Sequence, residues 1–203
     1  CCFSLNSVKV VTQTVANRIE LCSGFAEGGL TPSIGLITKS LECSKIPIYV
    51  MIRPRGGDFV YSISEIETMI SDIEIIKKMD PAGFVFGVLN NDGSLNNAAM
   101  KNLMSVADPL PVTFHRAIDV ASNTDIIIDQ LIELGVENIL TSGQKPNCIT
   151  GKSTIKKMIV QSKNKINIMV GSGLTIENVN EIIEIKPNAI HLTAKMPVNC
   201  SMK

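Results

Sequence analysis

Charged and thiol-bearing residues interrupt the short apolar runs of this sequence, where packing alone would favour aliphatic side chains. In the run Arg18–Ser23, which reads RIELCS, side chains of an extended segment alternate between two faces, so Arg18, Glu20 and Cys22 share one face. Buried charges are costly unless they are paired, and we therefore interpret this face as part of a site. A buried layer of ion pairs with a structural role only is the alternative interpretation.

Both histidines of the chain follow the same alternation. His115 shares a face with Thr113 in PVTFH, and His191 shares a face with Thr193 in AIHLTA. Together with Glu20 they could carry out acid–base chemistry, with Glu20 and His115 as base and acid and His191 as a second acid. The reaction class would be proton transfer or lyase-type chemistry on a small anionic substrate. A Schiff-base route is disfavoured, because the predicted strand interiors contain no lysine.

Two glycine-containing loops have anion-binding character. The segment Arg53–Asp58, which reads RPRGGD, combines two guanidinium groups with glycines that let backbone amides approach a carboxylate or phosphate. The turn Gly171–Gly173 leads into a helix start, a place where barrel enzymes often bind phosphate. The full set of predicted anion-binding residues is Arg18, Arg53, Arg55, Asp58, Arg116, Ser142, Gly171 and Gly173.

Short β-branched runs alternate with longer amphipathic stretches along the whole chain, a pattern typical of repeated βα units and a parallel sheet. A strand stub is predicted at Cys1–Phe3. Seven full strands are predicted at Arg18–Ser23, Ile46–Arg53, Gly83–Leu89, Pro111–His115, Asn138–Ser142, Ile166–Gly171 and Ala189–Ala194. Helices are predicted at Ser64–Met79, Asn96–Ala107, Thr124–Leu134, Ser153–Ser162 and Ile176–Ile185, with Ser62 or Ser64, Asn123 and Thr175 as capping residues.

About eight strands with polar residues at many of their carboxyl ends favour a closed barrel over a doubly wound open sheet. We therefore predict an α/β fold of the TIM-type (β/α)8 barrel class, as a single domain over residues 1–203. Such barrels usually need about 250 residues, so we expect this one to be truncated at both ends.

Composition excludes several functions. The 19 basic and 19 acidic side chains cancel, which leaves no positive field for nucleic acid. The longest apolar runs have the length of a strand, so no membrane span is expected. The six cysteines show no C-x-x-C and no disulfide-scaffold spacing, which favours reduced thiols in the cytosol.

The strings that carry the candidate residues resemble those of the CutC copper homeostasis family. They are RIELCS from Arg18, EGGLTPS from Glu27, MIRPRGGDF from Met51, VTFHRA from Val112 and LTSG from Leu140. The resemblance covers essentially the whole chain. It implies a TIM-type barrel, a cytoplasmic location, homo-oligomers and a link to copper tolerance.

The same resemblance implies that Cys1 and Cys22 are Cu(I) ligands. Cu(I) is soft and prefers thiolates, so the assignment is chemically reasonable. The other cysteines, which are Cys2, Cys43, Cys148 and Cys200, are interpreted as small apolar residues. The leading hypothesis is a cytoplasmic Cu(I)-binding protein. The alternatives are an enzyme that uses the polar face described above, or a module that binds a small anionic ligand without catalysis.

Overall fold

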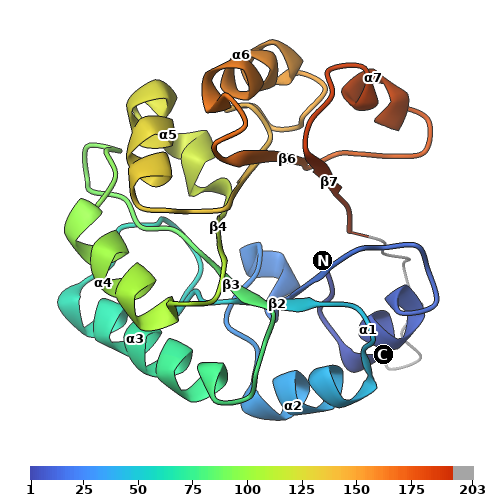
Figure 1. Cartoon of the computed structure of the whole chain (residues 1–203), viewed down its shortest axis with the longest axis vertical. Coiled ribbons are helices and arrows are strands. Elements are labelled where there is room, and N and C mark those ends of the chain that lie inside the picture. The colour runs from blue at the N-terminus through green and yellow to red at the C-terminus, as the bar shows by residue number, and fades with distance from the viewer. Residues whose placement is uncertain (194–203) are drawn as a thin grey trace, which may run out of the picture.

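The computed structural model describes residues 1–193 and contains one parallel sheet whose strands follow one another in chain order (Figure 1). The predicted strand Ala189–Ala194 ends earlier in the structure, and Ala194 and Cys200 lie outside the described residues. The strands are β1 Ile19–Leu21, β2 Ile48–Met51, β3 Gly83–Phe86, β4 Val112–Phe114, β5 Asn138–Thr141, β6 Asn167–Gly171 and β7 Ala189–His191. All seven predicted strands are confirmed, with shorter bounds.

The first residues of the chain lie between β1 and β7 and close the ring of strands. Cys2 forms a parallel bridge with Leu21, in which Cys2 N donates to Glu20 O at 2.8 Å and Cys22 N donates to Cys2 O at 2.9 Å. On the other side, the backbone nitrogen of Cys1 donates to Leu192 O, just after β7. The predicted stub Cys1–Phe3 therefore occupies the place of an eighth strand.

Helices surround this ring on the outside (Figure 1). Four predicted helices, α3 to α6, are confirmed to within two residues at each end. Ser62 caps α3 with a complete capping box, and Asn123 caps α5. The helices are α1 Leu5–Val11, α2 Ile34–Cys43, α3 Ile63–Lys77, α4 Asn97–Ala107, α5 Thr124–Glu133, α6 Lys152–Ser162 and α7 Val179–Ile183, with short 3₁₀ segments η1 Phe25–Glu27 and η2 Arg116–Val120.

Three helices differ from the prediction. Spacing did not indicate α1 or α2, because α1 is short and buries only Val8, and α2 carries polar residues between its apolar ones. The helix predicted to begin at Ile176 begins at Val179 instead, and Thr175 does not cap it. The Asn178 side chain accepts from Thr175 N and donates to Gly173 O, so this stretch forms a turn before the helix starts.

The alternation predicted for the strands is present. Ile19, Leu21 and Phe114 are buried in the main core between sheet and helices. A second, smaller cluster on the inner side contains Cys22 and Met51. Apolar residues therefore face the helices and the polar set faces the barrel interior.

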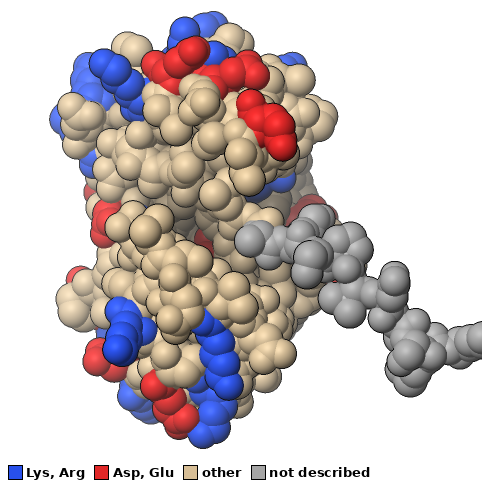
Figure 2. Space-filling model, turned by 90° about the vertical axis from the view of Figure 1, so that its right-hand side faces the viewer, with Lys and Arg blue, Asp and Glu red and all other residues tan. Residues whose placement is uncertain are grey.

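The outer side of β7 departs from this pattern. Ile190 and Leu192 are 39% and 47% exposed, because no helix of the described residues covers them. On this side of the molecule, charged side chains lie toward the two ends and leave a band with few charges between them (Figure 2). None of the helices among residues 1–193 has the length and hydropathy that a membrane span requires.

Candidate functional site

The structure brings Cys1, Glu20 and His191 together inside the ring of strands. Glu20 is the central residue of β1, His191 ends β7, and Cys1 lies between these strands. One ligand atom from each of the three residues lies within 4.8 Å of the others. Glu20 Oε1 is 3.8 Å from His191 Nε2, and Cys1 Sγ is 2.9 Å from Thr193 Oγ1. These side chains form the candidate metal centre.

The Cys22 thiol lies beside one member of this cluster, Glu20. Its Sγ donates to Glu20 Oε1 at 3.7 Å, so the two thiols predicted to hold copper both lie close to one carboxylate. Burial raises the pKa of the Cys22 thiol well above its usual value, and the Glu20 charge raises it further. The thiol is therefore protonated at neutral pH in the absence of a metal ion.

His191 presents a neutral imidazole to the same cluster. Burial lowers the pKa of His191, and the neighbouring Glu20 carboxylate opposes that effect only in part. A neutral imidazole has a lone pair available for a metal ion. The mutually close donor set therefore comprises one thiol, one imidazole and one carboxylate, and the Cys22 thiol contacts the carboxylate of this set.

His115 lies apart from this cluster. It is 4% exposed, and its Nδ1 accepts from Ala117 N at 3.2 Å, while its Nε2 has no partner in the structure. Burial and the positive charge of Arg53 lower the pKa of His115 to about 3. Glu20 contacts Cys22 and His191, and no contact within residues 1–193 joins it to His115. The predicted roles of Glu20 and His115 as base and acid on a substrate do not need such a contact and stay a prediction.

The arginines of the loop after β2 are engaged by protein groups. Arg53 donates from Nη1 to Glu27 O at 2.6 Å and to Gly29 O at 3.1 Å, and from Nη2 to Gly57 O at 2.8 Å. These bonds tie the loop after β1 to the loop after β2. An anion-binding role for Arg53 stays a prediction.

Arg55 is held by acidic residues of its own neighbourhood. Its Nε donates to Glu65 Oε1 at 2.5 Å, and its Nη2 lies 3.0 Å from Asp58 Oδ1. Glu65 belongs to the capping box of α3, so Arg55 braces the start of that helix. The predicted anion-binding roles of Arg55 and Asp58 are untested.

Arg116 and Ser142 meet at a residue that the sequence reasoning missed. Asp119 accepts from Arg116 Nε at 2.8 Å and from Ser142 Oγ at 2.9 Å, and Arg116 Nη2 also donates to Ser142 Oγ at 2.8 Å. Asp119 follows Arg116 by three residues, and that spacing was the available signal. This network joins η2 to the end of β5.

The remaining predicted residues lie elsewhere on the barrel. Arg18 precedes β1 at the amino end of the sheet, where its guanidinium stacks 4.6 Å from the centre of the Tyr49 ring. At Gly171 a Cβ atom would lie 3.2 Å from His191 Cβ, so glycine permits the close approach of β6 and β7. Gly173 has a φ of +76° and forms the following turn.

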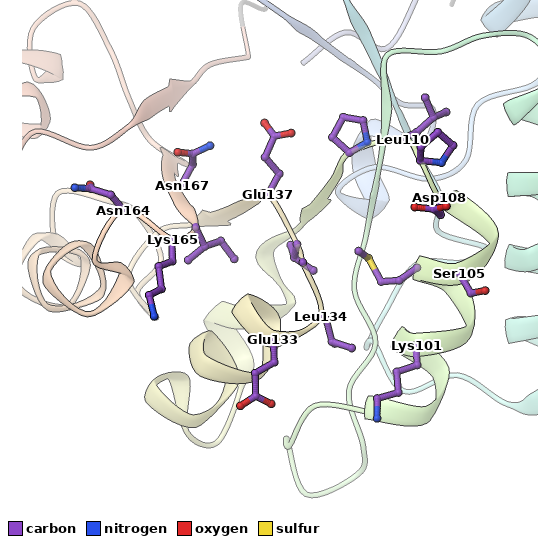
Figure 3. A pocket seen from close by; sticks show the side chains of 16 residues that line it. Lys101, Ser105, Asp108, Leu110, Glu133, Leu134, Glu137, Asn164, Lys165 and Asn167 are labelled. Atoms are coloured by element: carbon purple, nitrogen blue, oxygen red, sulfur yellow. The ribbon is translucent and has the colours of Figure 1, made fainter.

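A groove of about 880 Å³ lies at the other end of the barrel, near the amino ends of β5 and β6 (Figure 3). Its walls come from the end of α4, the end of α5 and the segment before β6, and Lys101, Glu133, Glu137 and Lys165 project around it. The groove therefore carries two positive and two negative side chains. The groove contains none of the predicted site residues.

The sequence of this chain is similar to those of known proteins over nearly its whole length. The chain is 43% identical over 194 residues to a family protein CutC of Photorhabdus laumondii, covering 96% of this chain and 78% of the relative. It is 41% identical over 204 residues to the copper homeostasis protein cutC homolog of Homo sapiens, covering 100% of this chain and 75% of the relative.

Solved structures agree. The crystal structure of a copper homeostasis protein CutC from Streptococcus agalactiae superposes with a TM-score of 0.89 at 34% identity, covering 94% of this chain and 95% of that one. A dihydrodipicolinate synthetase from Pseudomonas aeruginosa superposes with a TM-score of 0.66 at 9% identity, over 92% of this chain and 62% of that one, a likeness of fold alone. The predicted TIM-type barrel is confirmed. Because the model of the CutC family matches residues 1–196, this chain belongs to the CutC family.

Proposed function

We propose that this protein binds Cu(I) as a cargo in copper homeostasis, through the thiolates of Cys1 and Cys22. One observation carries the proposal: two thiols from different segments reach the same inward-facing carboxylate, Glu20, with the His191 imidazole beside it. Membership of the CutC family supports the same function.

The donor set suits a soft monovalent ion. Thiolates and a neutral imidazole are ligands that Cu(I) accepts readily, whereas the harder carboxylate of Glu20 is better placed as a proton acceptor. The Cys22 thiol already donates to Glu20, so the proton released when Cys22 ligates a metal ion has an acceptor 3.7 Å away. Binding should therefore become tighter as the pH rises, because the thiol proton competes with the ion.

The location and assembly of the protein follow as parts of the proposal. Cu(I) ligation needs reduced thiols, and the five cysteines of the described residues are free, which supports a cytoplasmic location. The resemblance to the family favours a homo-oligomer. Light scattering of the purified chain at several concentrations tests the oligomer, and a monomer at every concentration would contradict it.

An anaerobic Cu(I) titration against a competing chelator tests the copper proposal. Cys1→Ser and Cys22→Ser should each weaken binding at least about tenfold, because each removes one of two soft ligands. Cys148→Ser is the matched control, since Cys148 is also a buried free thiol but lies in the loop after β5. Equal affinity in all three variants, or no competition with the chelator in the parent chain, would contradict the assignment.

One observation favours an enzyme as a second candidate. Glu20 lies 3.8 Å from the neutral His191, and a carboxylate beside an imidazole is an arrangement that can transfer protons. The reaction would be proton transfer or lyase-type chemistry on a small anionic substrate. A screen of such substrates, with Glu20→Gln as the inactive reference, would identify turnover. Turnover that is equal in the parent chain and the variant would exclude Glu20 from this role.

A further inference from the structure

Arg53 is a buried cation that forms no direct ion pair within residues 1–193, and its charge acts only at longer range on the exposed Asp58 carboxylate, which is paired with Arg55. Its side chain is 5% exposed, and its three acceptors are the neutral backbone carbonyls of Glu27, Gly29 and Gly57. Its Nε–H is buried and has no acceptor. A buried charge without a contacting counter-ion is costly, so this position favours an anion.

A second buried donor without an acceptor, after Arg53 Nε, belongs to His115. Because its Nδ1 accepts from Ala117 N, the proton of the neutral imidazole is on Nε2. That Nε2 is buried and unpartnered. A buried N–H without an acceptor loses the hydrogen bond that water would supply to it in the unfolded chain.

The side chains of Arg53 and His115 both pack against the ring of Phe59. The Arg53 guanidinium carbon lies 4.9 Å from the centre of the Phe59 ring, and the His115 ring centre lies 4.7 Å from it. The Tyr61 hydroxyl is buried beside them; burial raises its pKa, and the charge of Arg53 and a side-chain interaction with Arg53 oppose that effect. Phe59 itself is only half-buried, so this cluster borders the surface at the mouth of the barrel.

We propose that Arg53 and His115 bind the carboxylate of a small monoanion, which accepts from Arg53 Nε and His115 Nε2 beside the Phe59 ring. A monoanion matches the single buried charge of Arg53, because His115 is neutral and contributes a donor without a charge. A phosphate dianion would leave one negative charge unbalanced in the same buried place. This inference is independent of the copper proposal, which depends on Cys1 and Cys22.

Imidazole NMR of the folded chain tests the proposal directly. The chain has only two histidines, so its spectrum contains two sets of imidazole signals, and the set missing from His115→Phe belongs to His115. Titration with sodium acetate should move the His115 Nε2–H signal downfield in a saturable manner, because the proton gains a charged acceptor. Acetamide, which has the same shape without the charge, and sodium chloride should leave it in place.

Two variants and a control define the site by calorimetry with acetate. Arg53→Lys should weaken acetate binding at least about tenfold, because a charge-assisted hydrogen bond is lost. His115→Phe should do the same, and it keeps the test valid if loss of the Arg53 loop contacts prevents folding of the first variant. Arg55→Lys is the control, since Arg55 is on the same loop but is already paired with Asp58 and Glu65.

Absence of a His115 shift up to high millimolar acetate would overturn the proposal. So would an equal shift with acetamide, or equal binding in His115→Phe. Those results would mean that water alone satisfies the two donors. Cu(I) affinity, measured separately, would be unaffected by any of these outcomes.

Discussion

The carboxylate of Asp119 joins the segment after β4 to the end of β5, and Asp119→Ala removes this connection. Its oxygens accept from Thr141 Oγ1 at 2.6 Å, from Ser142 N at 2.9 Å and from Ser142 Oγ at 2.9 Å. Thr141 and Ser142 are fully buried, so water cannot replace the missing acceptor. We expect the variant to fold with a much lower free energy of unfolding.

The magnitude follows from which donors lose their only good acceptor. Ser142 Oγ has a second acceptor in Lys145 O at 2.6 Å, and the Arg116 side chain is 42% exposed and can be hydrated. The Thr141 hydroxyl keeps only the weakly accepting Met158 sulfur at 3.8 Å, and the Ser142 amide remains without an acceptor. Each costs about 1–3 kcal/mol, so Asp119→Ala should lose about 2–6 kcal/mol.

Urea denaturation followed by circular dichroism measures the loss, as a lower midpoint at an unchanged slope. Asp119→Asn keeps one acceptor oxygen and should lose less than the alanine variant. Asp129→Ala, an exposed carboxylate on α5, is the control and should change stability by no more than about 0.5 kcal/mol. A loss below about 1 kcal/mol in Asp119→Ala would refute the reasoning that these donors depend on this carboxylate.

Four further predictions use the same kinds of argument. Cys22 releases a proton on ligation, so it should contribute up to about tenfold per pH unit to the rise of Cu(I) affinity between pH 6 and 8. Chelator competition should show a slope that is shallower by this contribution in Cys22→Ser. The pKa of His115 is about 3 in the folded chain and higher in the unfolded chain, so the unfolded state binds the extra proton. The free energy of unfolding should therefore fall as the pH drops below about 6.5, by up to about 1.4 kcal/mol per pH unit. His115→Phe should flatten this dependence in urea titrations. Gly151→Ala would place a Cβ atom 1.9 Å from Ser142 O, and the resulting backbone shift should lower the melting temperature by several degrees. Ser62→Ala should cost about 1 kcal/mol through loss of the α3 capping box, a loss that Ser62→Thr should largely restore in thermal melts.

Local patterns predicted the barrel well where the period of the chain is regular. The alternation in RIELCS and PVTFH placed Glu20, Cys22 and His115 on the inner side, and the structure confirms this because the apolar neighbours pack against helices. The regular spacing of apolar residues along α3 and its Ser62 cap were likewise predictable from the sequence. Helix α2 was not, because its polar residues obscure the period and its burial depends on the sheet beneath it.

The partners of charged side chains were the part that local patterns could not supply. Arg53 and Arg55 look alike in RPRGGD, yet one holds three backbone carbonyls and the other pairs with acidic residues. The hydrogen-bond acceptors of a guanidinium come from loops that can be far apart in the chain. Its partners therefore cannot be predicted before the packing of those loops is known.

The sequence by itself determined the order of βα units, the inward placement of the polar residues and, through its motifs, the likeness to the CutC family, because these depend on neighbouring residues only. The tertiary structure alone decided which inward residues meet. Ring closure brings Cys1 to Glu20 and His191, which are far apart in the chain, whereas His115 and Arg53 both lie against the Phe59 ring. The physical reason is that neighbours across a barrel are set by strand order and register, which no local spacing encodes.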